Sequence, residues 1–334
     1  MAGWGLIGAS NIARQYVIKA INAQPDAEVV GVVSSSPDRA AAYARELNLP
    51  KHFRALDELL ADPGIESVYI STTNEQHRDQ AIAAARAGKH VLCEKPLALT
   101  LADARQMVDA CSDAGVVMAT NHHLRNAGLH RRIRDMVANG AIGNVLAVRV
   151  FHAVYLPDVL QGWRIDNPQA GGGVVLDITV HDADTVRFVL GEDPIEVAAM
   201  TASHGMGKSG LADTVMGVMR MRSGALVQFH DAFTIKHVPT GFEVHGTEGS
   251  LIARNCMTQN PVGELTLRRG NDETVIDDFE RGDLYTRSVQ NFMAAVNGIG
   301  QPSATAEDGL WSLATALAVQ ESAETGKAAR VNMI

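Results

Sequence analysis

The sequence predicts an α/β protein with an N-terminal doubly wound parallel sheet and a C-terminal α+β domain on an open, largely antiparallel sheet. Three observations support this prediction. Apolar strands alternate with helices over the first third of the chain. After about Arg125 this alternation stops, and strand pairs joined by turn signals follow. The length of 334 residues is typical of about two domains, which we expect at 1–122 and 123–334.

In the first part, each expected strand is a short apolar run and each expected helix has apolar residues at helical spacing. Pro37 favours a helix start, Thr100 is a capping residue, and Gly88 stops a helix. The expected strands cover 4–8, 28–36, 65–73, 89–95 and 116–123. The expected helices cover 12–22, 37–48, 77–88 and 101–115.

In the second part, a polar, glycine-rich loop separates a long strand from a helix. The strand is expected at 145–155, the loop at 156–173 and the helix at 173–191. Further helices are expected near 126–139, 284–298 and 305–327, and strand pairs at 215–221 with 225–233 and 242–246 with 250–255. An alternative for the two terminal helices, at 284–298 and 305–327, is that they pack on the first domain.

Composition excludes several classes of protein. Hydrophobic residues make up 46% and charged residues 20%, as in a folded globular protein. The net charge of −9 argues against a nucleic-acid partner. No apolar run is long enough for a membrane span, and the start lacks a leader signal, so we expect a cytoplasmic protein. The three cysteines, Cys93, Cys111 and Cys256, are far apart and indicate reduced thiols.

The segment GLIGASNIA joins the first strand to the first helix, where a dinucleotide-binding fold has Gly-x-Gly-x-x-Gly/Ala. Here those positions are Gly8, Ser10 and Ala13, so only the first is glycine. The alternative is an ordinary tight turn. The strand–turn–helix context favours a nucleotide, because a helix N-terminus attracts a pyrophosphate.

The end of the second strand bears on the choice between NAD and NADP. An acidic residue there would bind the ribose hydroxyls of NAD, but Ser34 occupies the place and Arg39 follows. A guanidinium pairs well with a 2′-phosphate, which favours NADP(H). Asp38 weakens this argument, and the alternative is that Arg39 is a solvated helix residue.

Glu94, Lys95 and Pro96 follow a buried strand at the edge where ligands bind in open α/β sheets. A lysine there can polarise a substrate oxygen or help to move a proton. The alternative is a surface Glu–Lys pair. Pro96 keeps the lysine backbone out of the helical region and permits a cis peptide bond.

Asp177 and His181 are four residues apart on one expected helix and therefore share a face. An aspartate in this position can orient a histidine for acid–base chemistry, and Asp184 could hold the other ring edge. Zinc binding is the sharper alternative, but there is no HExxH-type motif and we predict no metal. The adjacent His122 and His123 on a strand would point to opposite faces.

Trp163 and Arg164 lie in the glycine-rich loop. The indole offers a flat apolar face of the kind on which sugar rings stack, and the guanidinium offers a fork of donors. The alternative is a tryptophan packed on the domain edge.

Together these motifs resemble the Gfo/Idh/MocA family of NAD(P)-dependent oxidoreductases. GLIGASNIA, STTNEQH, HVLCEKPLALT and GGGVVLDITVHDADT match its landmarks in order over essentially the whole chain. The resemblance implies catalytic roles for Lys95, Asp177 and His181. It places at the cofactor Gly8, Ala9, Ser10, Asn11, Ile12, Ala13, Ser34, Ser35, Arg39, Ser71, Thr72, Thr73, Asn74, Glu75, Gln76, His77 and Glu94. It places around the bound cofactor and substrate Asn121, His122, Trp163, Arg164 and Tyr285.

The resemblance implies an N-terminal Rossmann domain and the NADPH-dependent reduction of a small cyclic sugar ketone. Lys95 would polarise the carbonyl, and His181, held by Asp177, would donate the proton. The alternatives are a pyranose or inositol dehydrogenase and a non-catalytic NADP-binding sensor. In such proteins the open sheet often forms a subunit interface, so a homo-oligomer through the C-terminal sheet is a further hypothesis.

Overall fold

The computed structural model describes residues 1–333, which form two compact units. The first unit comprises Met1–His123 and Tyr285–Leu310. The second comprises Leu124–Leu284 and the described residues from Trp311 onward. Over these 333 residues no helix has the length and apolar character needed to cross a membrane. The three cysteines are buried free thiols, as expected.

The first unit contains a six-stranded parallel sheet in the order β3-β2-β1-β4-β5-β6, which is the doubly wound order expected of a dinucleotide-binding domain. Its strands are β1 (Ala2–Ile7), β2 (Ala27–Val33), β3 (Lys51–His52), β4 (Ser67–Ile70), β5 (His90–Cys93) and β6 (Met118–Thr120). Every expected strand is present, but β2, β4, β5 and β6 end two or three residues before the expected positions. The residues after those ends form loops along the carboxyl edge of the sheet.

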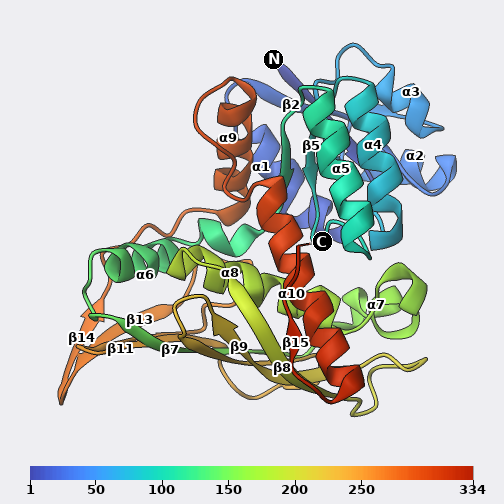
Figure 1. Cartoon of the computed structure of the whole chain (residues 1–334). Helices are drawn as coiled ribbons and strands as arrows, with labels where there is room; N and C mark the ends of the chain where they lie inside the picture. Colours follow the sequence, from blue (N-terminus) through green and yellow to red (C-terminus); the bar gives the residue numbers. More distant parts are fainter. Residues whose placement is uncertain (334) are drawn as a thin grey trace. The chain divides into compact units, whose positions relative to one another are not determined.

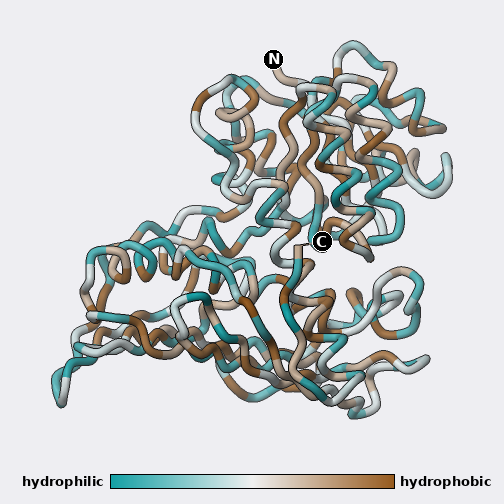
Figure 2. Tube along the Cα trace, in the orientation of Figure 1, coloured by the Kyte–Doolittle hydropathy of each residue, from teal (hydrophilic) through white to brown (hydrophobic). Residues whose placement is uncertain are grey.

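Helices cover both faces of this sheet. They are α1 (Ile18–Asn22), α2 (Pro37–Glu46), α3 (Leu56–Leu60), α4 (His77–Arg86), α5 (Leu101–Asp113) and α9 (Leu284–Val296). Figure 1 shows α4 and α5 side by side against one face and α1 on the other, as right-handed crossovers on either side of β1 require. Figure 2 shows the strands between them as the most hydrophobic part of the unit.

The expected capping residues act as predicted. Ser36 accepts a hydrogen bond from the Arg39 amide at the start of α2. Thr100 accepts one from the Asp103 amide at the start of α5. Side-chain caps of this kind satisfy helix N–H groups that have no partner in the helix. The two caps therefore fix where α2 and α5 begin after the loops of the carboxyl edge.

The second unit contains a nine-stranded sheet in the order β14-β13-β12-β11-β7-β10-β9-β8-β15. Only β7 and β10 pair in parallel among its described strands, so the sheet is largely antiparallel as predicted. The strands are β7 (Val145–Ala153), β8 (Pro194–Ala202), β9 (Thr214–Met221), β10 (Leu226–Ala232), β11 (Gly241–Gly246), β12 (Ser250–Arg254), β13 (Glu264–Arg269), β14 (Asp272–Ile276) and β15 (Ala329–Arg330).

Helices α6 (Gly128–Ala138) and α8 (Val180–Leu190) lie over one face of this sheet, as Figure 1 shows. The helix that contains α8 starts before it with a π-helical turn, η6 (Val175–Thr179), so the expected helix over 173–191 is present. Gly191 ends it in the left-handed conformation, with φ 69°. Helix α10 (Ala306–Thr325) confirms the last expected helix.

Two expectations about the loops are wrong. The segment 156–173 is not wholly irregular, because it contains the short helix α7 (Gly162–Asp166) between the 3₁₀ turns η4 (Asp158–Leu160) and η5 (Pro168–Ala170). His122 and His123 do not lie on a strand, because β6 ends at Thr120, His122 is in the irregular segment that follows, and His123 opens the 3₁₀ turn η3 (His123–Asn126). The alternating-face argument therefore does not apply to this histidine pair.

Candidate functional site

Gly8 turns the chain from β1 into the loop before the first helix. Its φ of 112° is in the region that only glycine adopts readily. A Cβ at this position would lie 3.0 Å from the carbonyl carbon and oxygen of Ser71, at the end of β4. The loops after β1 and β4 can therefore approach closely only because residue 8 is glycine.

Ser10, at the second fingerprint position, organises the same loop. Its hydroxyl lies 2.8 Å from the Ser71 hydroxyl and accepts a hydrogen bond from the Ala13 amide at 3.1 Å. Its carbonyl accepts a hydrogen bond from the Tyr43 hydroxyl at 2.8 Å. The serine hydroxyl thus makes two contacts that a second glycine could not, and the backbone carbonyl ties the loop to α2. The helix that follows begins with a π-helical turn, η1 (Ala13–Val17).

Arg39 lies beside this loop, as the sequence suggested. Its guanidinium donates to the carbonyl of Ala9 at 3.1 Å, while the side chain remains exposed on the first turn of α2. Ser34 follows the end of β2 and Ser36 caps α2. The structure therefore brings a cation and hydroxyl groups together at the end of β2, where a dinucleotide-binding fold holds the adenosine ribose.

Glu94 is the centre of a hydrogen-bond network behind Lys95. Its carboxyl accepts from the Tyr69 hydroxyl at 2.5 Å and from the Asn121 side-chain amide at 2.7 Å. Ser288 in α9 donates to the Asn121 side-chain oxygen at 3.0 Å. Withdrawal from water raises the pKa of the Glu94 carboxyl, although the hydrogen bonds and the Lys95 charge oppose the rise. Glu94 is therefore held in place rather than free on the surface.

Lys95 is half-buried in the loop after β5, and its peptide bond to Pro96 is cis, as the sequence permits. His77 lies behind this loop with no exposed surface. Its Nδ1 is 3.0 Å from the Pro96 carbonyl oxygen and its Nε2 is 3.3 Å from the Thr72 carbonyl oxygen. Burial lowers the pKa of His77, which favours the neutral ring. A neutral ring has one N–H and donates to only one of these carbonyls at a time, so His77 lies between the Lys95 loop and the loop over 71–76 without bonding to both.

Tyr285 lies in the first unit between two other rings. It stacks on Tyr16 with the ring centroids 4.7 Å apart and on His123 with the centroids 5.3 Å apart. Only 1% of the residue is exposed. Tyr285 therefore has a firm packing role in addition to the site role that the resemblance implies.

In the second unit, Trp163, Arg164 and Asp177 form one cluster. The Arg164 guanidinium carbon lies 4.7 Å from the Trp163 ring centroid, and its Nε is 3.3 Å from the Asp177 carboxylate. Trp163 and Arg164 come from α7, and Asp177 comes from the π-helical turn before α8. The structure thus joins the aromatic face and the carboxylate that sequence analysis placed in separate motifs.

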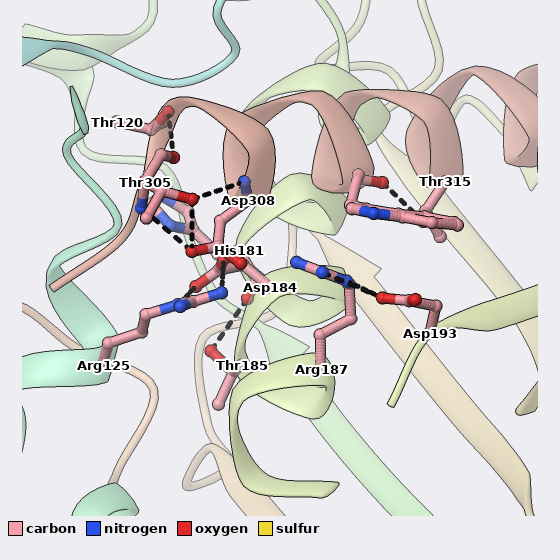
Figure 3. A network of polar contacts seen from close by, with 11 residues as sticks. Thr120, Arg125, His181, Asp184, Thr185, Arg187, Asp193, Thr305, Asp308 and Thr315 are labelled. Atoms are coloured by element: carbon pink, nitrogen blue, oxygen red, sulfur yellow. Dashed lines mark hydrogen bonds and ion pairs between the residues drawn. The ribbon is translucent and has the colours of Figure 1, made fainter. Parts of the chain in front are cut away.

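His181 lies one turn after Asp177 and is 7% exposed. The ring centroid of His152, in β7, is 6.3 Å from that of His181. Asp184, which could hold the His181 ring on spacing alone, forms a two-pronged ion pair with Arg125 at 2.7 and 2.8 Å (Figure 3). The Thr185 hydroxyl donates to the His181 carbonyl in the same view. Asp184 thus stabilises the helix that carries His181.

Sequence reasoning missed several residues that hold these groups. Tyr69 and Ser288 complete the Glu94 network, and His152 lies next to His181. Each acts across a large sequence separation, and no local pattern marks it. Lys95 belongs to the first unit, whereas Asp177 and His181 belong to the second.

The residues of the first unit fit a dinucleotide. The glycine turn at Gly8, the hydroxyl of Ser10 and the guanidinium of Arg39 are polar, compact and at the carboxyl edge of a parallel sheet. A pyrophosphate needs donors and a close backbone approach at that place, and an adenosine phosphate needs a cation. Within residues 1–333, no three His, Cys, Asp or Glu side chains gather closely enough to hold a metal ion.

Comparisons with known proteins agree with this geometry. A family model described as an oxidoreductase family with an NAD-binding Rossmann fold matches residues 2–122. The model of the GFO/IDH/MocA C-terminal domain matches residues 130–252. Both parts of the chain therefore match one family, in the order that the sequence predicts.

Individual relatives cover the whole chain. The chain is 60% identical over 331 residues to 1,5-anhydro-D-fructose reductase of Ensifer adhaerens, covering 99% of each chain. It is 32% identical to D-xylose 1-dehydrogenase (NADP(+)) 2 of Haloferax volcanii, covering 98% of this chain and 99% of the relative. A solved structure of levoglucosan dehydrogenase in complex with NADH and levoglucosan is 26% identical, with a TM-score of 0.87 and 100% of both chains covered. On this sequence and structural agreement, the chain belongs to the Gfo/Idh/MocA family of oxidoreductases.

Proposed function

We propose that this protein reduces a cyclic sugar ketone with NADPH, and that 1,5-anhydro-D-fructose is the substrate and 1,5-anhydro-D-mannitol the product. The observation that carries the proposal is the identity of 60% over 331 residues to 1,5-anhydro-D-fructose reductase. The Trp163–Arg164–Asp177 cluster supports it, since an aromatic face beside hydrogen-bonding groups suits a sugar ring. We also propose the cytoplasm as the location, where the proposed cofactor NADPH would be supplied.

The proposed chemistry adds a hydride to the carbonyl carbon and a proton to the carbonyl oxygen. When bound, the reduced nicotinamide supplies the hydride. Lys95 donates a hydrogen bond to the carbonyl oxygen and stabilises the negative charge that develops there. His181 supplies the proton that makes the hydroxyl.

Asp177 is assigned the orientation of His181 on the basis of their spacing. Its carboxylate is itself held by Arg164. Glu94, which Tyr69 and Asn121 hold by hydrogen bonds, directly precedes Lys95 in the sequence. Its carboxyl also interacts electrostatically with the Lys95 charge. The two carboxyls proposed to assist the reacting groups are thus themselves held in place by hydrogen bonds, which favours the positioning that acid–base catalysis requires.

Arg39 is the proposed contact for the NADPH 2′-phosphate. It already lies at the phosphate loop, with its guanidinium on the Ala9 carbonyl. Ser34 and Ser35 offer hydroxyls rather than a carboxylate at the end of β2, so they would not repel a phosphate. The levoglucosan dehydrogenase complex contains NADH, so the family fold alone does not decide this preference.

The second candidate is oxidation of a pyranose or cyclitol, the same chemistry in the other direction. The 32% identity to a D-xylose 1-dehydrogenase favours it. A third candidate, an NADP-binding sensor, predicts tight binding without turnover.

The test is an assay of purified full-length protein at 340 nm across two panels, NADPH with cyclic ketoses and NADP⁺ with sugars and cyclitols. We expect NADPH oxidation to be fastest with 1,5-anhydro-D-fructose. Faster NADP⁺ reduction with a pyranose or inositol would replace the proposal with the dehydrogenase. NADPH binding without turnover on either panel would favour the sensor.

A further inference from the structure

Two aspartates from different elements meet inside the second unit. Asp182 belongs to α8 and Asp231 to β10, and neither has any exposed surface. Among residues 1–333, no lysine or arginine forms an ion pair with either of them. Burial of two carboxyls without a permanent cation is costly if both are ionised.

On each of the two carboxyls, one oxygen is hydrogen-bonded to a neighbouring side chain and the other is not. The Thr179 hydroxyl donates to Asp231 Oδ2 at 2.6 Å. His152 Nδ1 lies 2.7 Å from Asp182 Oδ1. Asp182 Oδ2 and Asp231 Oδ1 are both buried, and no N–H or O–H group of any other described residue donates to either oxygen. The two side chains are close enough to share a hydrogen bond. Ionised carboxylates only accept hydrogen bonds, so this contact requires a proton on one of them.

The sheet register explains why the groups meet. Asp231 and His152 are direct partners in the parallel pairing of β10 with β7, so both side chains point to the same face. Asp182 comes to that face from α8, which lies over it. Thr179 reaches the same place from the π-helical turn. The arrangement thus depends on the fold itself and not on one flexible side chain.

Electrostatics agrees with a retained proton. Burial raises the pKa of Asp182 to about 7. Burial raises the pKa of Asp231 well above its usual value, and the adjacent Asp182 raises it further. Because the two carboxyls interact, their pKa values describe the pair rather than either residue, and the pair loses its protons in two coupled steps.

Two other titratable groups near the pair are neutral at pH 7. Burial lowers the pKa of His130, on α6, to about 4, and raises the pKa of the Cys256 thiol to about 12. His152, on β7, contacts Asp182 directly, and His181, on α8, lies beside His152. Asp184, further along α8, is engaged by Arg125.

We propose that Asp182 and Asp231 hold one shared proton at neutral pH, and that this proton makes His152 a positioning residue beside His181. With the proton on Asp231, its hydroxyl donates to Asp182, and the Asp182 carboxylate accepts from His152 Nδ1–H. The His152 tautomer is then fixed, with the hydrogen on Nδ1. No proton moves during turnover in this scheme. Its catalytic part rests on the proposed function, whereas the shared proton does not.

Infrared spectroscopy of the full-length protein at pH 7 tests the shared proton. The difference between wild type and Asp231→Asn is expected to contain the carbonyl stretch of a protonated carboxyl, which shifts in D₂O. Glu94→Gln is the matched control, because withdrawal from water also raises the pKa of this carboxyl outside the pair, and the band assigned to Asp231 should survive this change. Loss of an ionised carboxylate band instead would overturn the proposal. Asp231→Ser, which keeps a hydroxyl, replaces the asparagine variant if that variant does not fold.

Stability against pH gives a second test that does not depend on turnover. The folded protein keeps a proton that the unfolded chain, with an ordinary aspartate pKa, has lost above about pH 4. Wild-type stability therefore falls as the pH rises from there towards the pKa of the pair, whereas asparagine does not titrate. The unfolding constant of wild type relative to Asp231→Asn should rise about tenfold per pH unit. A ratio that is independent of pH would contradict a shared proton.

Kinetics tests the positioning of His152. Asp182→Ala removes the acceptor of His152 Nδ1–H and should lower kcat by about tenfold or more, with the NADPH dissociation constant unchanged. Asp182→Asn retains an acceptor oxygen and should restore most of kcat. If the infrared band is present but Asp182→Ala leaves kcat unchanged, the shared proton stands and the positioning role of His152 is wrong. A wild-type protein that reduces no sugar ketone would overturn the proposed function and leave the infrared result standing.

Discussion

At the scale of single residues, Lys95 and His181 are the groups on which the proposed chemistry depends. Lys95→Ala and His181→Ala should each lower kcat by about 10²–10⁴. The dissociation constant of NADPH, measured by fluorescence titration, should change little, because neither change alters the phosphate loop. Matched controls are Lys89→Ala and His245→Ala, which change the same residue types elsewhere in each unit. Wild-type turnover in either site variant would remove that residue from the mechanism.

Arg39 carries the cofactor preference. Arg39→Ala should reduce the ratio of kcat/KM for NADPH to that for NADH by about tenfold to a hundredfold, since a charge-assisted hydrogen bond contributes roughly 1.5–3 kcal/mol. Arg45→Ala is the matched control, because it removes the same charge from an exposed position on the same helix. An unchanged ratio in Arg39→Ala would show that the 2′-phosphate is bound elsewhere.

Glycine substitutions separate backbone strain from close approach. Gly8 and Gly88 both have positive φ, 112° and 71°, but only Gly8 has neighbours that a Cβ would meet. Gly88→Ala should cost about 1 kcal/mol of unfolding free energy, whereas Gly8→Ala should cost about 2–3 kcal/mol and also weaken NADPH binding. Chemical denaturation and fluorescence titration measure the two effects. Equal losses in the two variants would indicate that the contact with Ser71 relaxes without cost.

At the scale of elements, the sequence predicted those whose burial pattern is strong. β1, β4 and β5 are nearly all buried, and their apolar runs identify them. β3 has two exposed residues and β14 is exposed over most of its length, so neither shows an apolar alternation. Such strands exist because a neighbouring strand offers hydrogen bonds, which a single-sequence pattern does not contain.

The candidate site was predictable to the same extent. Gly8, Ser10, Lys95, Asp177 and His181 follow local motifs, so the sequence alone nominates them as site residues. Tyr285 joins Tyr16 and His123, and Ser288 joins Asn121, across more than a hundred residues. The π-helical turns before α1 and α8 also could not be predicted, because no known sequence pattern identifies a π-helical turn. They occur often at functional sites, so their presence at Ala13–Val17 and Val175–Thr179 agrees with the proposed roles.

At the scale of the whole molecule, the outer face of the nine-stranded sheet has an apolar row. Met200, Met216, His230 and Phe151 are successive partners across β8, β9, β10 and β7. Met200 is 81% exposed and Met216 is 52% exposed. Neighbouring exposed methionines are consistent with the hypothesis of a homo-oligomer through this sheet, which we propose to test.

The oligomer has a direct test. Wild type should elute as a dimer or larger assembly in size-exclusion chromatography with light scattering, and Met216→Glu should shift it to the monomer, because a buried charge without a partner opposes association. Ile299→Glu, a similar change at an exposed residue of the first unit, should leave the assembly intact. A monomeric wild type would contradict the proposal.

His77 gives the first unit a property that neither of the loops beside it has alone. Its ring lies 3.3 Å from the Thr72 carbonyl oxygen, in the proposed cofactor loop, and 3.0 Å from the Pro96 carbonyl oxygen, next to the proposed reactive lysine. A ligand that orders one loop should therefore favour order in the other, and thermodynamic linkage makes the effect reciprocal. We expect cofactor and sugar to bind with positive cooperativity, measured as a lower NADPH dissociation constant in the presence of the sugar.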